Sequence, residues 1–81
     1  MKILKFSASW CNPCKMLSKT LEGMNLPYEV EEVDIEDNTA LSNKYQIRGV
    51  PTLVLVKDNG DELRRTVGAL KADCIGEWLS E

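Results

Sequence analysis

The chain has 81 residues, enough for one small domain over residues 1–81 and for no second core. Its composition, 43% hydrophobic and 28% charged, is that of an ordinary globular protein and not of a disordered or membrane-embedded one. Lysine and arginine number 10 and acidic residues 13, a net charge of -3, so no nucleic-acid partner is expected. The chain contains no histidine, which removes Cys–His and Ser–His nucleophile pairs.

The first half of the chain predicts a strand, a helix, a second strand and a second helix. Residues 3–7 alternate as a short strand, and a helix then opens at Cys11 and ends near Gly23. Residues 28–35 alternate well enough for a strand, and a short helix is expected over residues 38–45. The first strand should place Leu4 and Phe6 on one face and Ile3, Lys5 and Ser7 on the other. The first helix has an apolar stripe of Cys14, Leu17, Leu21 and Met24.

The second half predicts a hairpin and a final helix. Residues 52–56 form a continuous apolar run, which is typical of a central strand covered on both faces. The Asp-Asn-Gly sequence at 58–60 predicts a hairpin turn, and residues 62–67 return as a charged edge strand. A glycine turn at Gly68 then leads into the last helix. We expect its buried stripe to consist of Cys74, Ile75, Trp78 and Leu79.

The element order is therefore βαβαββα. The strand–helix–strand unit of the first half should be a right-handed crossover between two parallel strands, whereas the hairpin strands are antiparallel. The sequence predicts an α/β fold with a four-stranded mixed sheet in the order 2-1-3-4 and helices on both faces.

The motif Cys11-Asn12-Pro13-Cys14 contains the candidate reactive residues. Residues three apart in a helix lie roughly 5–6 Å apart at Cβ, close enough for a disulfide after small adjustment. Pro13 suits a first helical turn, where its missing N–H is not needed. A cysteine at a helix N-terminus faces free N–H groups and the positive end of the helix dipole, and both stabilise its thiolate. These residues predict a redox-active dithiol, with Cys11 exposed and nucleophilic and Cys14 behind it.

Three motifs, in this order along the chain, resemble those of the thioredoxin family. Residues 10–15, Trp-Cys-Asn-Pro-Cys-Lys, are similar to the family's Trp-Cys-Gly-Pro-Cys-Lys. Residues 47–53 resemble the loop that carries its cis-proline, and residues 67–70 its glycine turn. The resemblance extends over nearly the whole chain from Ile3 onward and implies a thioredoxin fold. The usual thioredoxin has a further strand and helix in front, so the implied fold is the minimal core.

The resemblance also implies a mechanism that needs no cofactor beyond the Cys11–Cys14 disulfide. Cys11 would attack a disulfide of a client protein, and Cys14 would resolve the resulting mixed disulfide. Pro51 would be cis and pack against the disulfide. The backbone of Val50 would bind an extended client segment, with Trp10, Gly68 and Ala69 forming the rim of the groove. The implied partners are disulfide-containing client proteins and a thioredoxin reductase, and a monomer is expected. The dipeptide Asn12-Pro13 would tune the redox potential.

One departure from the family lies beneath the motif. The family usually has a buried aspartate six residues before the first cysteine and a lysine on the adjacent strand. Here these positions are Lys5 and Glu32, so the pair has the opposite polarity. We hypothesise that Lys5 and Glu32 form a buried ion pair that tunes the dithiol. The alternative is that both side chains extend to solvent and matter little.

The sequence is also compatible with two other functions. A glutaredoxin would draw electrons from glutathione; the short chain favours it, whereas the motif and the Gly68-Ala69 turn favour a thioredoxin. A non-catalytic module could instead use its dithiol structurally or to hold zinc. Zinc needs about four ligands, and Cys74 is the only other cysteine, so no metal site is expected. We interpret Cys74 as a buried packing residue.

The cellular location is expected to be cytoplasmic. Lys5 interrupts the apolar residues after Met1, so no secretory signal is recognised. No stretch approaches the ~20 apolar residues of a membrane span, and no membrane partner is expected. Three cysteines are an odd number, which fits poorly with a secreted scaffold held by disulfides. In a reducing compartment a Cys-x-x-Cys motif is more often catalytic or metal-binding than structural.

Overall fold

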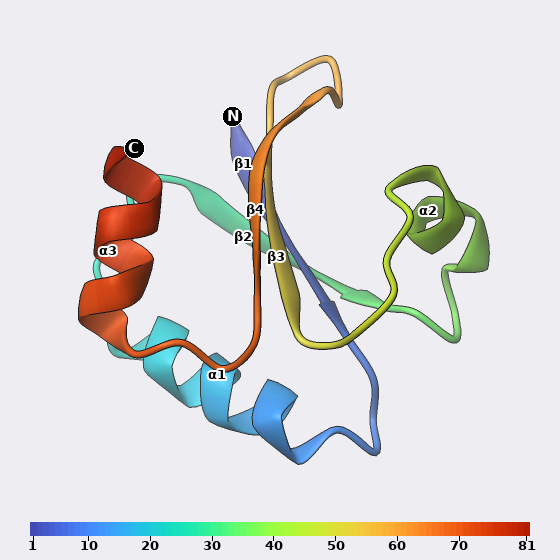
Figure 1. The fold of residues 1–81 in the computed structure, drawn as a ribbon, viewed down its shortest axis with the longest axis horizontal. Coiled ribbons are helices and arrows are strands. Elements are labelled where there is room, and N and C mark those ends of the chain that lie inside the picture. Colours follow the sequence, from blue (N-terminus) through green and yellow to red (C-terminus); the bar gives the residue numbers. More distant parts are fainter.

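The computed structural model describes all 81 residues, and its element order confirms the predicted βαβαββα pattern (Figure 1). None of the helices has the length and apolar character that would let it span a bilayer. Along the chain the elements are β1 (Lys2–Ser7), α1 (Asn12–Glu22), β2 (Glu29–Asp34), α2 (Thr39–Lys44), β3 (Thr52–Val56), β4 (Glu62–Val67) and α3 (Ala72–Ser80).

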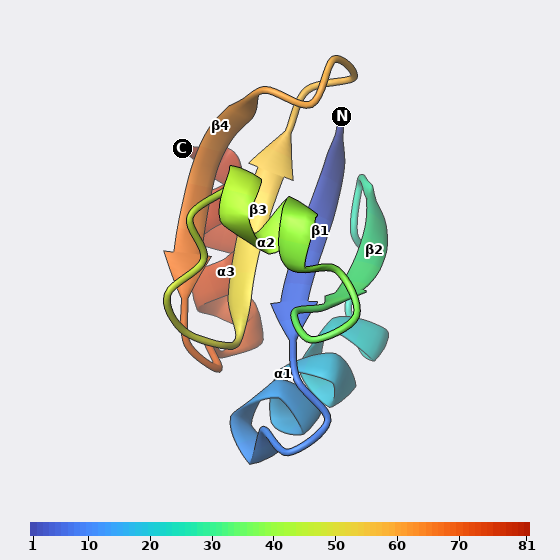
Figure 2. The same ribbon diagram turned by 90° about the vertical axis from the view of Figure 1, so that its right-hand side faces the viewer.

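The four strands form one mixed sheet in the order β2-β1-β3-β4, as predicted. Strands β1 and β2 are parallel, whereas β1 with β3 and β3 with β4 are antiparallel (Figure 2). Every residue of β3 is buried, which explains its continuous apolar sequence. The register pairs Lys5 of β1 directly with Glu32 of β2.

Helices cover both faces of the sheet, and each face has its own core. Helices α1 and α3 lie on one side and α2 on the other (Figure 1). Alternation along β1 divides its side chains between these cores, as predicted. The α1/α3 side buries Ile3, Leu17, Leu21, Leu53, Leu55, Ile75 and Trp78. The α2 side buries Leu4, Phe6, Val33, Tyr45, Val54 and Val56.

Cys74 departs from the prediction, because it is exposed and not buried. Helix α3 packs through Ile75 and Trp78, which are buried, and Leu79 is half-buried. Cys74 lies about 100° around the helix from Ile75, at the margin of the buried arc and in the first turn. Its thiol is free, so its predicted packing role is wrong.

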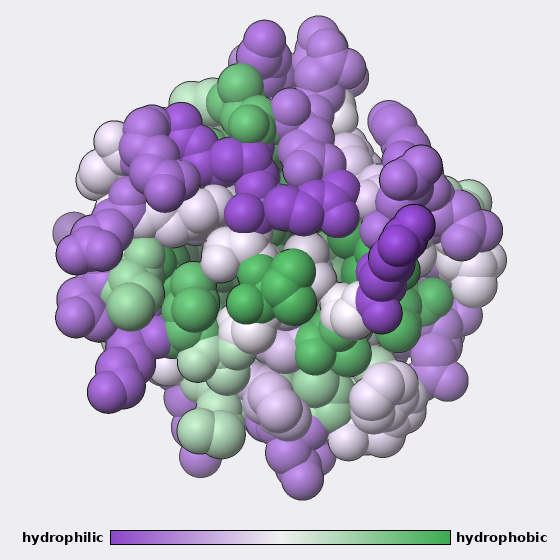
Figure 3. All heavy atoms as spheres, in the orientation of Figure 1, coloured by the Kyte–Doolittle hydropathy of each residue, from purple (hydrophilic) through white to green (hydrophobic).

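Large exposed apolar side chains are few. Figure 3 shows apolar residues across the middle of one face and hydrophilic residues crowding its upper part. The most exposed are Trp10 and Met16, each at 65%, and Val67 at 59%. Trp10 directly precedes the Cys-x-x-Cys motif and Val67 directly precedes Gly68, so two of the three flank predicted site residues.

Candidate active site

Cys11 and Cys14 form a disulfide at the start of α1, with their Cα atoms 5.3 Å apart. Cys11 is the N-cap of the helix, in an extended conformation, and Pro13 lies in the first turn. The backbone N–H of Cys14 donates a hydrogen bond to Cys11 Sγ, at 3.2 Å. Because this donor would also stabilise a negative charge on the sulfur, the helix start favours a Cys11 thiolate in the reduced protein.

Both cysteines of the disulfide are buried in this oxidised state. Cys11 is 4% exposed and Cys14 is 2% exposed, so the expectation of an exposed Cys11 is wrong here. The reason is packing, since the pair forms a small cluster with Ala8 against Ile35 and Val50. The distinction between the cysteines therefore rests on position at the N-cap, not on exposure.

The loop before β3 forms one wall beside the disulfide. The Val50–Pro51 peptide bond is cis, as the family resemblance implied, and Pro51 is buried. Val50 packs against the cysteine cluster, yet neither its N–H nor its carbonyl has a backbone partner. Unpaired, half-buried backbone groups beside a disulfide are suited to bind the backbone of an extended peptide.

Gly68 connects β4 to this wall. Its N–H donates to the carbonyl of Pro51 at 2.9 Å, and its φ of 106° is one that residues with a Cβ adopt only with strain. Ala69, which follows, is exposed. Trp10 is exposed in the turn before the disulfide, and Asn12 is exposed with no side-chain hydrogen bond. The structure thus joins Pro51 and Gly68 directly, whereas Trp10, Asn12 and Ala69 make no such contact.

Lys5 and Glu32 form the ion pair that the sequence suggested, but only half of it is buried. Lys5 Nζ donates to Glu32 Oε1 at 3.1 Å, and the side chains are 3% and 67% exposed, respectively. The ammonium also donates to Ser18 Oγ of α1, and Ser7 Oγ donates to Glu32 Oε1 at 3.2 Å. The network therefore joins β1, β2 and α1.

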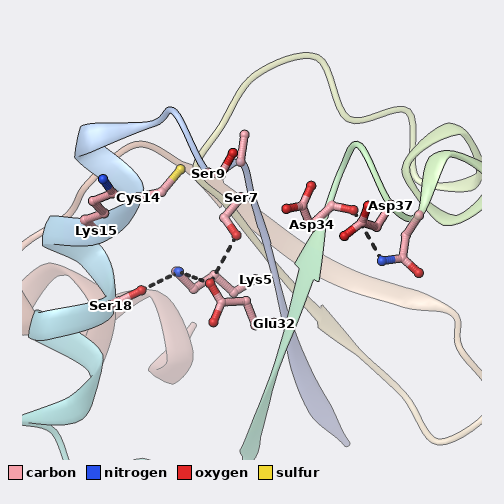
Figure 4. Close-up of a pocket in the computed structure, with 11 residues that line it drawn as sticks. Lys5, Ser7, Ser9, Cys14, Lys15, Ser18, Glu32, Asp34 and Asp37 are labelled. Atoms are coloured by element: carbon pink, nitrogen blue, oxygen red, sulfur yellow. Dashed lines mark hydrogen bonds and ion pairs between the residues drawn. The ribbon is translucent and has the colours of Figure 1, made fainter.

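This network borders an open polar cavity of about 440 Å³ next to Cys14. Figure 4 shows the Cys14 side chain at the top of the cavity, with the Ser18–Lys5–Glu32–Ser7 network below it. Solvent can therefore reach the neighbourhood of the buried Cys14 sulfur through a polar passage. The other lining residues are Ala8, Ser9, Lys15, Asp34, Asp37 and Asn38.

Sequence reasoning missed the two serines of the network. Ser18 follows Cys14 by four residues and so lies one turn further along the same side of α1. Ser7 shares its strand face with Lys5 by simple alternation. The spacing of both serines is visible in the sequence. Their hydrogen-bond partners, however, can be identified only when the distance between α1 and the sheet is known.

Comparison with known proteins shows which family the chain belongs to. A protein-family model described as Thioredoxin matches residues 1–81. The chain belongs to the thioredoxin family. Among curated relatives, it is 36% identical to the SPbeta prophage-derived thioredoxin-like protein YosR of Bacillus subtilis, covering all of this chain and 98% of that protein. It is 37% identical to the thioredoxin of Chlamydia trachomatis, covering 98% of this chain and 79% of that protein.

Solved structures of thioredoxins have the same fold as this chain. A mutant thioredoxin of Halobacterium salinarum superposes with a TM-score of 0.86 at 35% identity, over 96% of this chain and 70% of that one. Fasciola hepatica thioredoxin gives a TM-score of 0.84 at 31% identity, over 96% and 76% of the two chains. Family membership and the Cys11–Cys14 disulfide together make this thioredoxin-family chain a thiol–disulfide oxidoreductase.

Proposed function

We propose that the chain reduces disulfides of client proteins in the manner of a thioredoxin, with Cys11 as nucleophile and Cys14 as resolving thiol. The observation that carries the proposal is the hydrogen bond from the Cys14 N–H to Cys11 Sγ. That donor and the helix N-terminus both favour negative charge on the sulfur at position 11. Cys14 lies inside the helix and has no comparable backbone donor to its sulfur.

The first step forms a mixed disulfide. The Cys11 thiolate attacks one sulfur of the client disulfide, so that a bond forms between Cys11 Sγ and that sulfur. The bond between the two client sulfurs breaks, and the second client sulfur leaves as a thiolate that takes a proton from solvent. No metal or organic cofactor is required, because both electrons come from the dithiol.

The second step releases the client. Cys14 loses its proton, and its thiolate attacks Cys11 Sγ of the mixed disulfide. The Cys11–Cys14 bond forms, the bond to the client breaks, and the client leaves with both of its sulfurs reduced. The cycle closes when a reductant returns two electrons to the Cys11–Cys14 disulfide.

The wall beside the disulfide supports docking of an extended client segment. The unpaired N–H and carbonyl of Val50 would pair with client backbone, which gives affinity without sequence specificity. Trp10, 65% exposed, and the turn at Gly68-Ala69 would flank the segment. These are proposed roles for residues that surround the buried disulfide.

The electron donor separates the two enzymatic alternatives. We favour a thioredoxin reductase, because the Trp-Cys-Asn-Pro-Cys-Lys motif and the Gly68 turn follow the thioredoxin pattern. The runner-up is a glutaredoxin-type cycle driven by glutathione. A reducing, cytoplasmic setting is part of the proposal, since the exposed thiol of Cys74 is unpaired and such thiols persist best where disulfides are kept reduced.

The test is turnover of insulin disulfides in two parallel reactions. One contains NADPH and thioredoxin reductase, and the other contains NADPH, glutathione and glutathione reductase. We expect NADPH consumption in the first reaction only, and loss of it in Cys11→Ser. Activity in the second reaction alone would establish the glutaredoxin alternative. Inactivity in both, with stoichiometric zinc in the purified protein, would favour the non-catalytic module.

A further inference from the structure

We propose that Lys5 is a positioning residue for the second step, in which its buried ammonium promotes deprotonation of Cys14. This inference rests on the proposed function, because it concerns the resolving thiol of that cycle. Lys5 is 3% exposed, and lysine is almost never fully buried unless it is paired. Its ammonium borders the same cavity as Cys14, on the side of the network that faces α1 (Figure 4).

The unequal exposure of Lys5 and Glu32 determines whether the ion pair makes the potential at Cys14 positive or negative. The Glu32 side chain is 67% exposed, so solvent screens its charge, whereas the Lys5 side chain is 3% exposed. A charge in the protein interior acts over a given distance more strongly than one facing water. A buried site next to both groups therefore experiences a net positive potential. Such a potential stabilises a thiolate relative to a thiol.

Other charged residues line the cavity, but none of them is as deeply buried as Lys5. On α1, Lys15 is exposed and adds positive charge. On β2 and the turn that follows, Asp34 and Asp37 contribute negative charge from the open side of the cavity. Asp37 is exposed and Asp34 is half-buried, with Asp34 Oδ1 accepting the N–H of Glu36 at 2.8 Å. Lys5 is the only charged residue of the cavity that is fully buried.

The polar partners hold the ammonium in this place. Ser18 and Glu32 accept two of its N–H donors from opposite sides, one on α1 and one on β2. Since Ser18 follows Cys14 by one helical turn, the network fixes Lys5 against the same side of α1 that carries the thiol. In the second step the Cys14 proton passes to cavity water, and the resulting thiolate attacks Cys11 Sγ. In this proposal Lys5 acts through its charge and is not the proton acceptor.

The direct test is a titration that requires no client. In Cys11→Ser/Cys74→Ser, Cys14 is the only thiol, and its thiolate can be followed by ultraviolet absorbance as pH rises. Adding Lys5→Met, which keeps the length of the side chain but not its charge, should raise the midpoint by about one pH unit, as expected for loss of a nearby opposite charge. Adding Glu32→Gln instead should lower the midpoint, because it removes only the negative partner.

The second readout separates the two chemical steps. Reaction of the reduced Cys74→Ser protein with dithiobis(nitrobenzoate) releases one coloured thiolate when Cys11 attacks and a second when Cys14 resolves the adduct. In Lys5→Met the first phase should keep its rate, whereas the second should slow about three- to fourfold at neutral pH. The thiolate fraction falls about tenfold for one pH unit, but the more basic thiolate is about threefold more nucleophilic. Equal slowing of both phases would mean general damage to the site and would overturn the proposal.

If Lys5→Met does not fold, Lys5→Gln replaces it, because its amide is uncharged and can still donate to Ser18 and Glu32, the present partners of Lys5. A midpoint that does not rise in the Lys5 variant, or one that rises in Glu32→Gln, would contradict the proposed role of Lys5. Since the titration does not depend on a client or a reductase, this failure would leave the proposed oxidoreductase cycle intact. Conversely, a shifted midpoint in a protein without insulin turnover would sustain the Lys5 inference alone.

Discussion

The N–H of Gly68 donates to the carbonyl of Pro51 at 2.9 Å, and this bond ties the end of β4 to the cis-proline loop beside the disulfide. It continues the β3–β4 ladder beyond its last registered pair, Thr52 with Val67. Gly68 makes this bond with a φ of 106°, which other residues adopt only with strain. The shape of the groove wall therefore depends on one backbone conformation.

Gly68→Ala should destabilise the protein by about 1–2 kcal/mol, the cost of a left-handed conformation in a residue with Cβ. A Cβ at Gly68 would meet no atom within 4 Å, so the cost is backbone strain and not a clash. Gly76→Ala is the matched control, because a Cβ there also meets nothing within 4 Å, yet Gly76 lies inside α3. That control should be stabilising by about 0.5–1 kcal/mol. Urea unfolding measures both; equal effects of the same sign would refute the account.

Arg64 holds the end of α3 to the sheet. Its Nη1 donates to the carbonyls of Trp78 and Leu79 at 3.0 and 3.1 Å, where a helix otherwise leaves its carbonyls unpaired. Arg64→Met should lower the free energy of unfolding by about 1–2 kcal/mol, since these bonds involve a charged donor. Arg48→Met, at an exposed arginine without an ion pair, should change it by less than about 0.5 kcal/mol. Indistinguishable unfolding curves for the two variants would count against this role.

Acid should weaken the contact between Glu62 and Arg65. The Arg65 guanidinium donates to both Glu62 oxygens, at 2.6 and 2.7 Å, and these hydrogen bonds hold the pKa of Glu62 below its ordinary value of 4.5. A carboxyl whose folded pKa is lowered stabilises the protein above its unfolded pKa, and this contribution disappears as pH falls through the folded value.

Glu62→Gln should therefore be less stable than the parent at pH 7, by no more than about 1 kcal/mol because the pair is partly exposed. The difference should shrink once the pH falls below 4.5, the ordinary value for this carboxyl. The N-terminal ammonium also lowers the pKa of Asp58, but it does so in both proteins and cancels in the comparison. Thermal unfolding across this range measures the difference. A gap between the proteins that widens in acid would have the wrong sign.

Much of the fold could be predicted because local signals and global packing agree. The alternation of Leu4 and Phe6 with Ile3 and Lys5 assigned the two faces of β1, and the structure confirms that division. The apolar run of β3 indicated a central strand, and the right-handed crossover then left few sheet orders. The cis peptide before Pro51 came from family resemblance and not from any physical signal within the loop.

The site was less predictable where the outcome depended on exposure. Periodicity alone placed Cys74 in the apolar stripe, because it cannot tell the centre of a buried arc from its margin. Cys11 was expected to be exposed, but the disulfide packs against Val50, a residue distant in sequence. For Lys5 and Glu32 the hypothesis of a buried ion pair named the right partners, but only Lys5 is buried. Burial of Lys5 follows from α1 covering β1, whereas Glu32 lies on the edge strand β2 and reaches solvent.

The central claim is that Cys11 attacks a client disulfide and Cys14 resolves the product. The most direct measurement is mass spectrometry of reduced Cys14→Ser after mixing with an oxidised client protein, with Cys14→Ser/Cys74→Ser as the control for the exposed third thiol. The account predicts a stable client adduct on Cys11 in both variants, released by dithiothreitol, whereas Cys74→Ser alone should accumulate none. An adduct on Cys74 that vanishes in the control, or no adduct in either trapping variant, would contradict it.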